Sequence, residues 1–424
     1  MSSLPGPILV VSDQPDRKLV NALAGAGASA VIESTLTEAA ATIGERGPAA
    51  VIFADPELAP AGEVLEELIA AIDGAPAPFL PILARVKGCG ATALDVLPVD
   101  AAAGPEQIIP RLSTALRVRT LHATVLRRID TLRGNGTEVP QLPDRDPLDE
   151  ATVLVVGRGR SYPALAAAVG ARVGSIGALC VEHAARHLNT QDVDGLILGE
   201  GFGPSTVEAF LTALASDSRF RDLPIGLVPE LPRAMERGRL SGLEPVGGEP
   251  GDIIDHMLPL VRVHSFGARL RRHIAALDSR GTIDAQTALY TVGAFARELA
   301  RAIVGAKTNR ISLSIARFVF PMDQGWRFRI EAARLTGRLL GANDFACQIE
   351  DGSIVVVLAA PPRTAHVMAR KIASAMRLTM LDWQTGGRSH GPIEPVVTLA
   401  FLKAADTPES LLGRVSDPVA IAAE

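Results

Sequence analysis

The sequence predicts an α/β protein built from three consecutive blocks. Short β-branched runs alternate with helical segments through the first two blocks, which is typical of a parallel sheet covered by helices on both faces. The second block repeats the layout of the first, because the spacing Val153 to Leu196 resembles the spacing Ile8 to Val51. In the third block, the turn signal Asp351-Gly352 separates two β-rich runs and predicts a hairpin. A hairpin within an α/β pattern suggests a nucleotide-cyclase-like palm.

Length and composition limit the class of protein. At about 150 residues per domain, 424 residues correspond to about three domains. The hydrophobic content of 47% is too high for a disordered chain. The formal charge is 42 − 47 = −5, which argues against a broad nucleic-acid-binding face.

The cysteines and the N-terminus indicate a compartment. Cys89, Cys180 and Cys347 form no paired framework, which favours a reducing cytoplasm and argues against a structural zinc site. The N-terminus has no basic segment typical of a signal peptide. No uncharged run reaches the ~20 residues that span a bilayer. We expect a soluble, cytoplasmic protein without a membrane span.

The predicted elements divide the chain into residues 1–134, a Pro- and Gly-rich linker at 135–150, residues 151–278 and residues 279–424. The first block should contain strands at Ile8–Val11, Ala30–Glu33, Ala49–Asp55 and Phe79–Ala84, and a long helix at Gln107–Arg133. The second should contain strands at Thr152–Gly157, Gly177–Val181, Gly195–Glu200 and Pro224–Pro229, and a long helix at Asp252–Leu277. The basic run Arg269–His273 on that helix is expected to be an exposed face that could serve as a dimer contact.

The third block has a different order. It should contain helices at Thr287–Val304, Arg329–Leu340 and Thr364–Met376, and strands at Ile311–Phe318, Cys347–Ile349, Ser353–Ala360 and Val396–Leu402.

Three motifs in the third block resemble the GGDEF (diguanylate cyclase) family. DAQTALYTVGAF is similar to the entry motif of that family, with matches at Asp284, Thr287, Leu289 and Phe295. CQIEDGSIVVVL stands where the signature hairpin is expected, and LLGRVSDPVAIAAE is similar to the closing motif. The first two blocks resemble receiver domains of response regulators. The resemblance implies two receiver-like (flavodoxin-like) doubly wound parallel-sheet domains and one GGDEF (nucleotide-cyclase palm-like) α/β domain.

The residues that a cyclase needs are missing from this pattern. Two carboxylates must hold divalent metal against the triphosphate of GTP. The strand that supplies one of them in the family has Ala316 and Arg317 here, and the signature reads Glu350-Asp351-Gly352-Ser353-Ile354, with Gly352 at the metal-binding position. The segment Phe318–Trp326 lacks the family's guanine-binding pattern, and its phosphate-binding Lys falls at Ala423. We expect a degenerate cyclase that is not an enzyme.

A binding role is expected to remain. The resemblance implies a site for cyclic di-GMP at an R-x-x-D motif before the hairpin, where this chain keeps Asp344 but has Gly341 in place of Arg. Arg338, about one helical turn earlier, could substitute, and Arg370 and Lys371 could form a second wall. The alternative is that Arg338 is a solvated helix residue and that Asp344 caps a turn.

One of the two receiver-like blocks keeps acids for phosphorylation. A receiver needs an Asp nucleophile at a strand end and acids that hold Mg²⁺. Asp55 is the predicted phosphoacceptor, and Asp13 with Asp55 is the predicted Mg²⁺ site, although a one-residue shift would place Ala54 at the acceptor position. The expected switch hydroxyl falls at Ala84, and the expected Lys-Pro pair at Leu97-Pro98. The alternative reading is two loop acids at the edge of a sheet.

The second block lacks these acids. Its first strand ends in Gly157-Arg158-Gly159, and Gly199, beside Glu200, stands at the acceptor position. We expect this domain to act as a structural adaptor that is not phosphorylated.

The combined reading is a non-catalytic signalling effector that forms a homodimer, senses cyclic di-GMP and recruits adaptor or protease-recruitment proteins in cell-cycle control, with recruitment to a cell pole. The open alternatives are a ligand-free dimeric scaffold regulated by phosphorylation of the first block, and a residual diguanylate cyclase.

Overall fold

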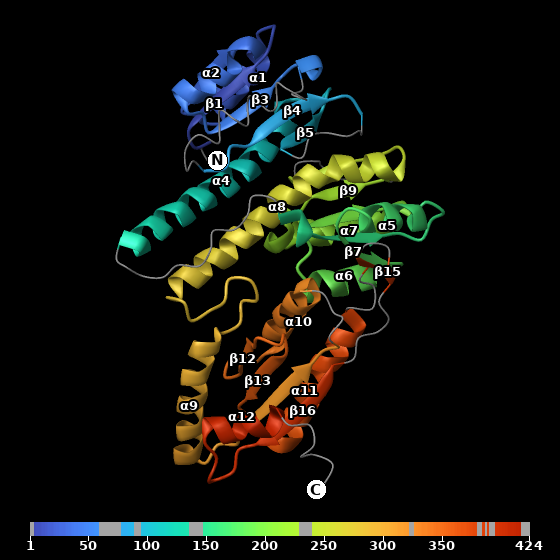
Figure 1. Ribbon diagram of the computed structural model, residues 1–424. Helices are drawn as coiled ribbons and strands as arrows, with labels where there is room; N and C mark the ends of the chain where they lie inside the picture. The colour runs from blue at the N-terminus through green and yellow to red at the C-terminus, as the bar shows by residue number, and fades with distance from the viewer. Residues whose placement is uncertain are drawn as a thin grey trace.

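A computed structural model describes residues 4–58, 78–88, 95–134, 147–228, 240–321, 326–379, 384–385, 388–389 and 395–416 of the chain. It shows the predicted α/β architecture, with three sheets and two long helices that run across the middle of the molecule (Figure 1). Some sequence predictions lie outside the described residues: most of the linker (135–146), the thiol at 89, the end of the expected guanine-binding segment (322–325) and the position at 423.

The first domain is a five-stranded parallel sheet in the order β2-β1-β3-β4-β5. This is the flavodoxin-like order, in which functional groups gather at the carboxyl ends of the strands. Strands β1 and β3 are almost wholly buried, so their continuous apolar runs are what a doubly covered sheet requires. The elements are β1 (Pro7–Val11), α1 (Arg17–Gly25), β2 (Ala30–Ser34), α2 (Leu36–Arg46), β3 (Ala50–Phe53), η1 (Pro56–Leu58), β4 (Ile82–Val86), β5 (Val96–Asp100) and α4 (Pro105–Gly134).

The second domain repeats this order as β7-β6-β8-β9-β10, all parallel. Its register repeats too: Val11 pairs with Phe53 in the first sheet and Val156 with Leu198 in the second, and both partners are displaced by 145 residues (156 − 11 and 198 − 53). The predicted internal repeat is confirmed. The elements are η2 (Pro147–Asp149), β6 (Thr152–Val156), α5 (Tyr162–Gly170), β7 (Gly174–Ala178), α6 (Val181–Thr190), β8 (Gly195–Leu198), α7 (Pro204–Ser216), η3 (Ser218–Phe220), β9 (Ile225–Leu227), β10 (Leu243–Pro245) and α8 (Pro250–Asp278).

The two domains meet through their long C-terminal helices, α4 and α8, which lie side by side (Figure 1). The backbones approach closely at Gly267, where an added Cβ would lie 3.1 Å from Val118. Phe266 packs edge-on against His122 with ring centroids 5.2 Å apart. Apolar residues of both helices belong to one core cluster, so the helices join the two sheets into a continuous interior.

The third domain is a four-stranded antiparallel sheet in the order β12-β13-β11-β16. The predicted hairpin is present as β12 and β13. Along β13, Val356 faces the core beneath α10 and α11, while Val355 and Val357 face the core beneath α9 and α12. The elements are α9 (Val292–Asn309), β11 (Ser314–Val319), α10 (Trp326–Leu339), β12 (Phe345–Gln348), β13 (Ile354–Leu358), α11 (Pro362–Thr379), β14 (Gln384–Thr385), β15 (Arg388–Ser389), β16 (Val396–Phe401) and α12 (Pro408–Ser416). Strand β14 pairs with β7 and so extends the sheet of the second domain.

Several predicted boundaries were wrong. The helix expected from Thr287 begins at Val292, because the Asp284 carboxylate accepts hydrogen bonds from the amide and hydroxyl of Thr287 and fixes a turn there. Ala288 in this turn has φ 60°, which a helix does not allow. The strand expected at Gly177–Val181 is Gly174–Ala178. Strands expected at Phe79–Ala84 and Ile311–Phe318 lie at Ile82–Val86 and Ser314–Val319.

Two further properties can be examined in the described residues. Cys180 and Cys347 are free thiols, and burial raises the pKa of the Cys347 thiol to about 12, which makes it a poor nucleophile. None of the helices within the described ranges combines the length and apolar composition of a membrane span.

Candidate functional sites

The hairpin of the third domain is closed by an arginine. Arg317, on β11, donates from Nε to Ser353 Oγ at 2.9 Å and pairs through its other nitrogen with the Asp351 carboxylate. The amide of Ser353 also donates to Asp351 at 2.8 Å. Partial burial opposes ionisation of Asp351, but the bonds from Ser353 and the charge of Arg317 outweigh it and hold the pKa below its ordinary value. The carboxylate at the turn is therefore already neutralised by a protein cation.

At Gly352, the position expected to bind metal, the space for a side chain is already filled. Gly352 has φ +82°, and a Cβ added there would lie 2.5 Å from Cδ of Arg329. A carboxylate side chain at this position would be strained and would displace Arg329. Glu350, on the same turn, is exposed. Two arginines thus lie at the turn where a cyclase of the resembled family needs carboxylates.

Asp344, a predicted ligand residue, holds a loop. Its two carboxylate oxygens accept hydrogen bonds from the amides of Gly341 and Ala359, each at 3.0 Å. The carboxylate therefore ties the segment before β12 to the end of β13. This is the turn-capping role that the sequence left open as an alternative.

The other predicted ligand residues point to different neighbours. Arg338, at the end of α10, forms an ion pair with Asp192 of the second domain. Arg370 and Lys371 are exposed on α11. Arg338 therefore joins the second and third domains, and its ion pair is with Asp192 rather than with Asp344.

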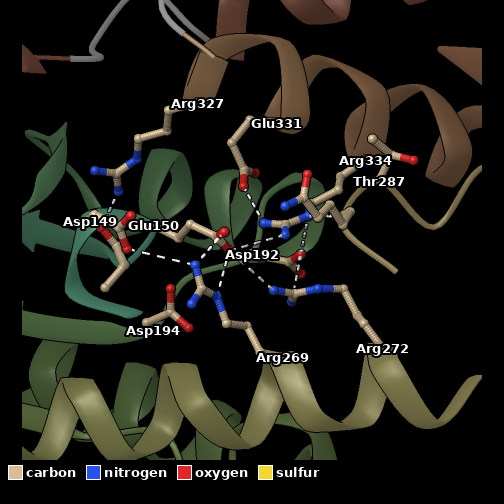
Figure 2. A network of polar contacts seen from close by, with 12 residues as sticks. Asp149, Glu150, Asp192, Asp194, Arg269, Arg272, Thr287, Arg327, Glu331 and Arg334 are labelled. Carbon is tan, nitrogen blue, oxygen red and sulfur yellow. Dashed lines mark hydrogen bonds and ion pairs between the residues drawn. The ribbon is translucent and has the colours of Figure 1, made fainter. Parts of the chain in front are cut away.

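A larger polar network joins the second and third domains (Figure 2). Arg269 and Arg272 project from α8, Glu331 and Arg334 project from α10, and the carboxylate of Glu150 lies between the two helices. Nη2 of Arg334 lies 3.6 Å from Glu150, and Nη1 of Arg334 bonds Glu331 at 2.6 Å. The remaining members of the network, from the loop after α6, η2 and α10, are Asp149, Asp192, Asp194, Arg327 and Arg338.

The network corrects the expectation for the basic run on α8. Arg269 and Arg272 are mostly buried, with 13% and 16% of their side chains exposed, and His273 is buried. Only Arg271 of the three arginines is exposed. The run is thus an interface between domains of one chain, because its arginines neutralise acids that the linker and α6 bring to the same place.

The charges in the network depend on one another. Burial opposes ionisation of Glu150 and Asp192, yet the surrounding arginines hold the pKa of both carboxyls below their ordinary values. Burial dominates at Glu331 and raises its pKa. Burial also lowers the pKa of Arg272 to about 10. Removing one member would leave its partners buried and unpaired, which makes the cluster cooperative.

A cavity of about 430 Å³ opens beside this network. Four arginines line it, Arg271 and Arg272 from α8 and Arg334 and Arg338 from α10, and Asp192 is the acid in its wall. Thr287 and Ala288 of the entry turn close one side. Such an excess of guanidinium groups suits an anion with several oxygen atoms.

In the first domain, the structure brings the predicted acids together. Asp55 directly follows β3, and its Oδ2 accepts hydrogen bonds from Ser12 Oγ at 2.8 Å and from the amide of Asp13 at 2.9 Å. The amide of Ala54 is bonded to Val11 at 3.0 Å, so Asp55 is the first residue free of the sheet. Nowhere in the described part of the chain do three His, Cys, Asp or Glu side chains gather as a metal site would require.

Arg85 is a residue at this edge that the sequence reasoning missed. Its guanidinium donates to the carbonyl oxygen of Ala54 at 2.8 Å and to Asp16 at 3.1 Å. It follows Ala84, the expected position of the switch hydroxyl, and supplies a cation where Leu97 supplies none. A charged residue in the otherwise apolar run PILARV was the available signal.

In the second domain, Glu200 occupies the place of Asp55 (200 − 55 = 145, the offset of the repeat). Its carboxylate accepts from Ser161 Oγ at 2.9 Å, and its backbone carbonyl accepts from the amides of Arg158 and Gly159. No acid faces it from the end of β6, where Gly157 and Arg158 replace Ser12 and Asp13. At this edge of the second sheet, Glu200 therefore holds together the loop that follows β6.

Comparisons with known proteins bear on the third domain. No protein-family model matches the chain, and no curated protein matches its sequence. Among solved structures, the coiled coil and GGDEF domain of DgcB from Caulobacter crescentus in complex with c-di-GMP is similar at 19% identity and a TM-score of 0.31, over 35% of this chain and 83% of that chain. The FimX GGDEF domain from Pseudomonas aeruginosa is similar at 16% identity and a TM-score of 0.28, over 32% and 89%. The diguanylate cyclase SiaD from Pseudomonas aeruginosa, in complex with its activator SiaC, is similar at 15% identity and a TM-score of 0.30, over 34% and 59%. Each of these matches covers about a third of this chain.

Proposed function

We propose that this protein is a signalling effector without catalytic activity that binds cyclic di-GMP through its third domain, in the manner of the PopA type of receiver–receiver–GGDEF response regulator. The observation that carries the proposal is the contact of Arg317 with Asp351 and Ser353. A guanidinium held at the hairpin takes the place of a metal ion, and a cyclase cannot stabilise two triphosphates without metal.

The arginine cavity beside the network is the proposed ligand site. Cyclic di-GMP carries two phosphates and two guanines, and arginine binds both groups through paired hydrogen bonds. Arg271 is exposed and can reach a ligand directly, whereas Arg338 reaches a ligand by releasing the Asp192 carboxylate. This site keeps Arg338 from the sequence prediction, and it replaces Asp344, which holds a loop.

Ligand binding there would be transmitted between domains. The cavity is lined by α8 of the second domain and α10 of the third, so a bound anion would compete with Asp192 for Arg338. The consequence is a change in how the third domain docks, which would alter the surface offered to adaptor or protease-recruitment proteins. A homodimer, a cell-cycle role and recruitment to a cell pole belong to the same proposal and rest on the resemblance alone.

Calorimetric titration of the full chain with cyclic di-GMP tests this function. We expect saturable heat with wild type and about tenfold weaker binding for Arg271→Ala and Arg338→Ala. Arg370→Ala and Lys371→Ala serve as matched controls, because they remove equally exposed cations from α11. Weaker binding in the α11 variants alone would move the site to α11, and no heat with wild type would remove the effector function.

Phosphorylation of the first domain is the second candidate, and it corresponds to a scaffold regulated at Asp55. It is favoured by the position of Asp55 at a strand end, where Ser12 and the amide of Asp13 hold its carboxylate. Acetyl phosphate with Mg²⁺ should add one phosphoryl group to wild type and none to Asp55→Asn, as measured by intact mass.

A further inference from the structure

A second cavity, of about 480 Å³, lies between the first and second domains and shares only Arg271 with the proposed nucleotide site. It is enclosed mainly by α4 and α8, with Leu4 and Leu97 from the first domain and residues 222–224 and 241–242 from the second. A space of this size at a domain interface is typical of a site for a small molecule.

The walls of the cavity are mainly apolar. Leu116 and Leu121 of α4 face Leu260 and Val263 of α8 across it. Such a lining holds water poorly and favours an apolar group. The occupant should therefore carry a flexible or flat apolar body that fills the space between the helices.

The arginines that line the cavity differ in whether an acid neutralises them. Arg111 and Arg117 also line it, but they are neutralised by Glu244 and Asp222. Arg271 is exposed, lines the same cavity, and forms no ion pair with a described residue. One cation without an ion pair to a described residue therefore lines a mainly apolar space.

We propose that this cavity binds an amphipathic anion, whose apolar tail lies between α4 and α8 and whose carboxylate or phosphate head pairs with Arg271. The ligand would contact both flavodoxin-like domains at once. Because a ligand that binds only the docked arrangement stabilises it, occupancy would tighten the association of the two domains.

Three eight-carbon probes test the proposal on the full chain: octanoate, octyl phosphate and neutral 1-octanol. Thermal unfolding and calorimetry should show saturable binding and a raised Tm for the two anions, with octanol about tenfold weaker. The alkyl chain of octanoate is one methylene shorter than that of octyl phosphate, which accounts for about a fourfold difference; a larger ratio identifies whether a carboxylate or a phosphate is preferred. Absence of binding by both anions would overturn the proposal.

Two variants separate a defined site from adsorption. Arg271→Gln should weaken the two anions about tenfold and leave octanol unchanged. Ser113→Trp, at a half-buried wall position, should fill the cavity and abolish binding of all three probes. The matched control is Arg127→Gln, which removes an exposed arginine of α4 and should leave the binding of all three probes unchanged.

The outcomes distinguish this site from the nucleotide site. Ser113→Trp should leave the binding of cyclic di-GMP unchanged, since Ser113 lines only the second cavity of the two. If circular dichroism shows that this variant does not fold, Arg338→Ala decides instead, because Arg338 lines only the nucleotide site: it should weaken cyclic di-GMP and leave octanoate unchanged, whereas Arg271→Gln should weaken both. Equal binding of octanoate to wild type, Arg271→Gln and Ser113→Trp would mean adsorption to the surface and would contradict the proposal.

Discussion

Arg117 on α4 and Arg262 on α8 occupy equivalent positions in the two repeats (262 − 117 = 145), and each forms an ion pair with an aspartate of the other repeat. Arg117 pairs with Asp222, and Arg262 pairs with Asp95. The two aspartates are not equivalent positions of the repeat (222 − 95 = 127), so the contacts follow an isologous interface between two copies on the arginine side only. The first two domains therefore associate within one chain as two subunits of a dimer would, through the same helix. A homodimer of the whole chain, which stays a prediction, would need another face.

The buried pair at this interface should matter more than the exposed one. Arg111 and Glu244 keep only 9% and 12% of their side chains exposed, and burial lowers the pKa of Arg111 to about 10. Glu244→Gln would leave Arg111 buried without an anion, and we expect a loss of about 3 kcal/mol in the free energy of unfolding. Asp222→Asn, at the exposed pair with Arg117, should cost less than about 1 kcal/mol. Urea denaturation measures both, and equal effects would refute this ranking.

His256 should make the same interface sensitive to acid. Burial and then the charge of Arg111 lower the pKa of His256 from 6.5 to about 4, although Asp100 opposes this. Above pH 6.5 both folded and unfolded states are neutral, so stability is full. As pH falls from 6.5 to about 4 the unfolded state takes up the proton first, which removes stability on the order of 3 kcal/mol. In His256→Gln this part of the pH dependence of unfolding should disappear, and an unchanged slope would contradict the assignment.

Asp192 should control how the third domain docks. Its carboxylate meets Arg338, Arg334 and Arg272, so Asp192→Asn would leave three guanidinium groups in mutual repulsion. We expect the free energy of opening of α10, measured by amide hydrogen exchange, to fall by about 1–3 kcal/mol. Asp217→Asn is the matched control, because Asp217 pairs only with Arg219 inside the second domain.

The same docking should respond to pH in a defined direction. The pKa of Asp192 is below its ordinary 3.8, so its contribution is present above pH 3.8 and is lost as pH falls through the lower folded value. Glu331 acts in the opposite direction because its pKa is raised. Because intrinsic amide exchange slows in acid, the rates of α10 are compared with the intrinsic rate at each pH. The protection of α10 should then fall in acid in wild type and fall less in Asp192→Asn; equal falls would show that Asp192 is not the controlling group.

The strands and the repeat were within reach of the sequence because they depend on local patterns, whereas the order of the strands in each sheet depends on distant pairings. Apolar runs such as ILVV and TVLVV could be read as buried strands, and Asp351-Gly352 as a hairpin turn. A sharper signal was available: Pro105, Ile108, Arg117 and Val118 of the first long helix recur 145 residues later as Pro250, Ile253, Arg262 and Val263.

The site could be predicted only in part, because its contacts join distant segments. Nothing near Arg338 in the sequence points to Asp192, which lies 146 residues away. The run Arg269–His273 looked solvated because its acidic partners, Glu150 after η2 and Asp192 after α6, are distant in the sequence. The Asp284 turn overrode the helical pattern that follows it, since its side-chain hydrogen bonds compete with helix formation. At the hairpin the residues of the turn could be read from the sequence, but the pairing of Arg317 with Asp351 could not.

The most direct test of the account is incubation of the full chain with GTP and either Mg²⁺ or Mn²⁺, with cyclic di-GMP measured by chromatography. The same preparation is first shown by calorimetry to bind added cyclic di-GMP, which establishes that it is folded and active in binding. With Arg317 bound to Asp351 and Ser353, we predict no product above a reaction without protein. Formation of cyclic di-GMP in proportion to protein concentration would contradict the central claim.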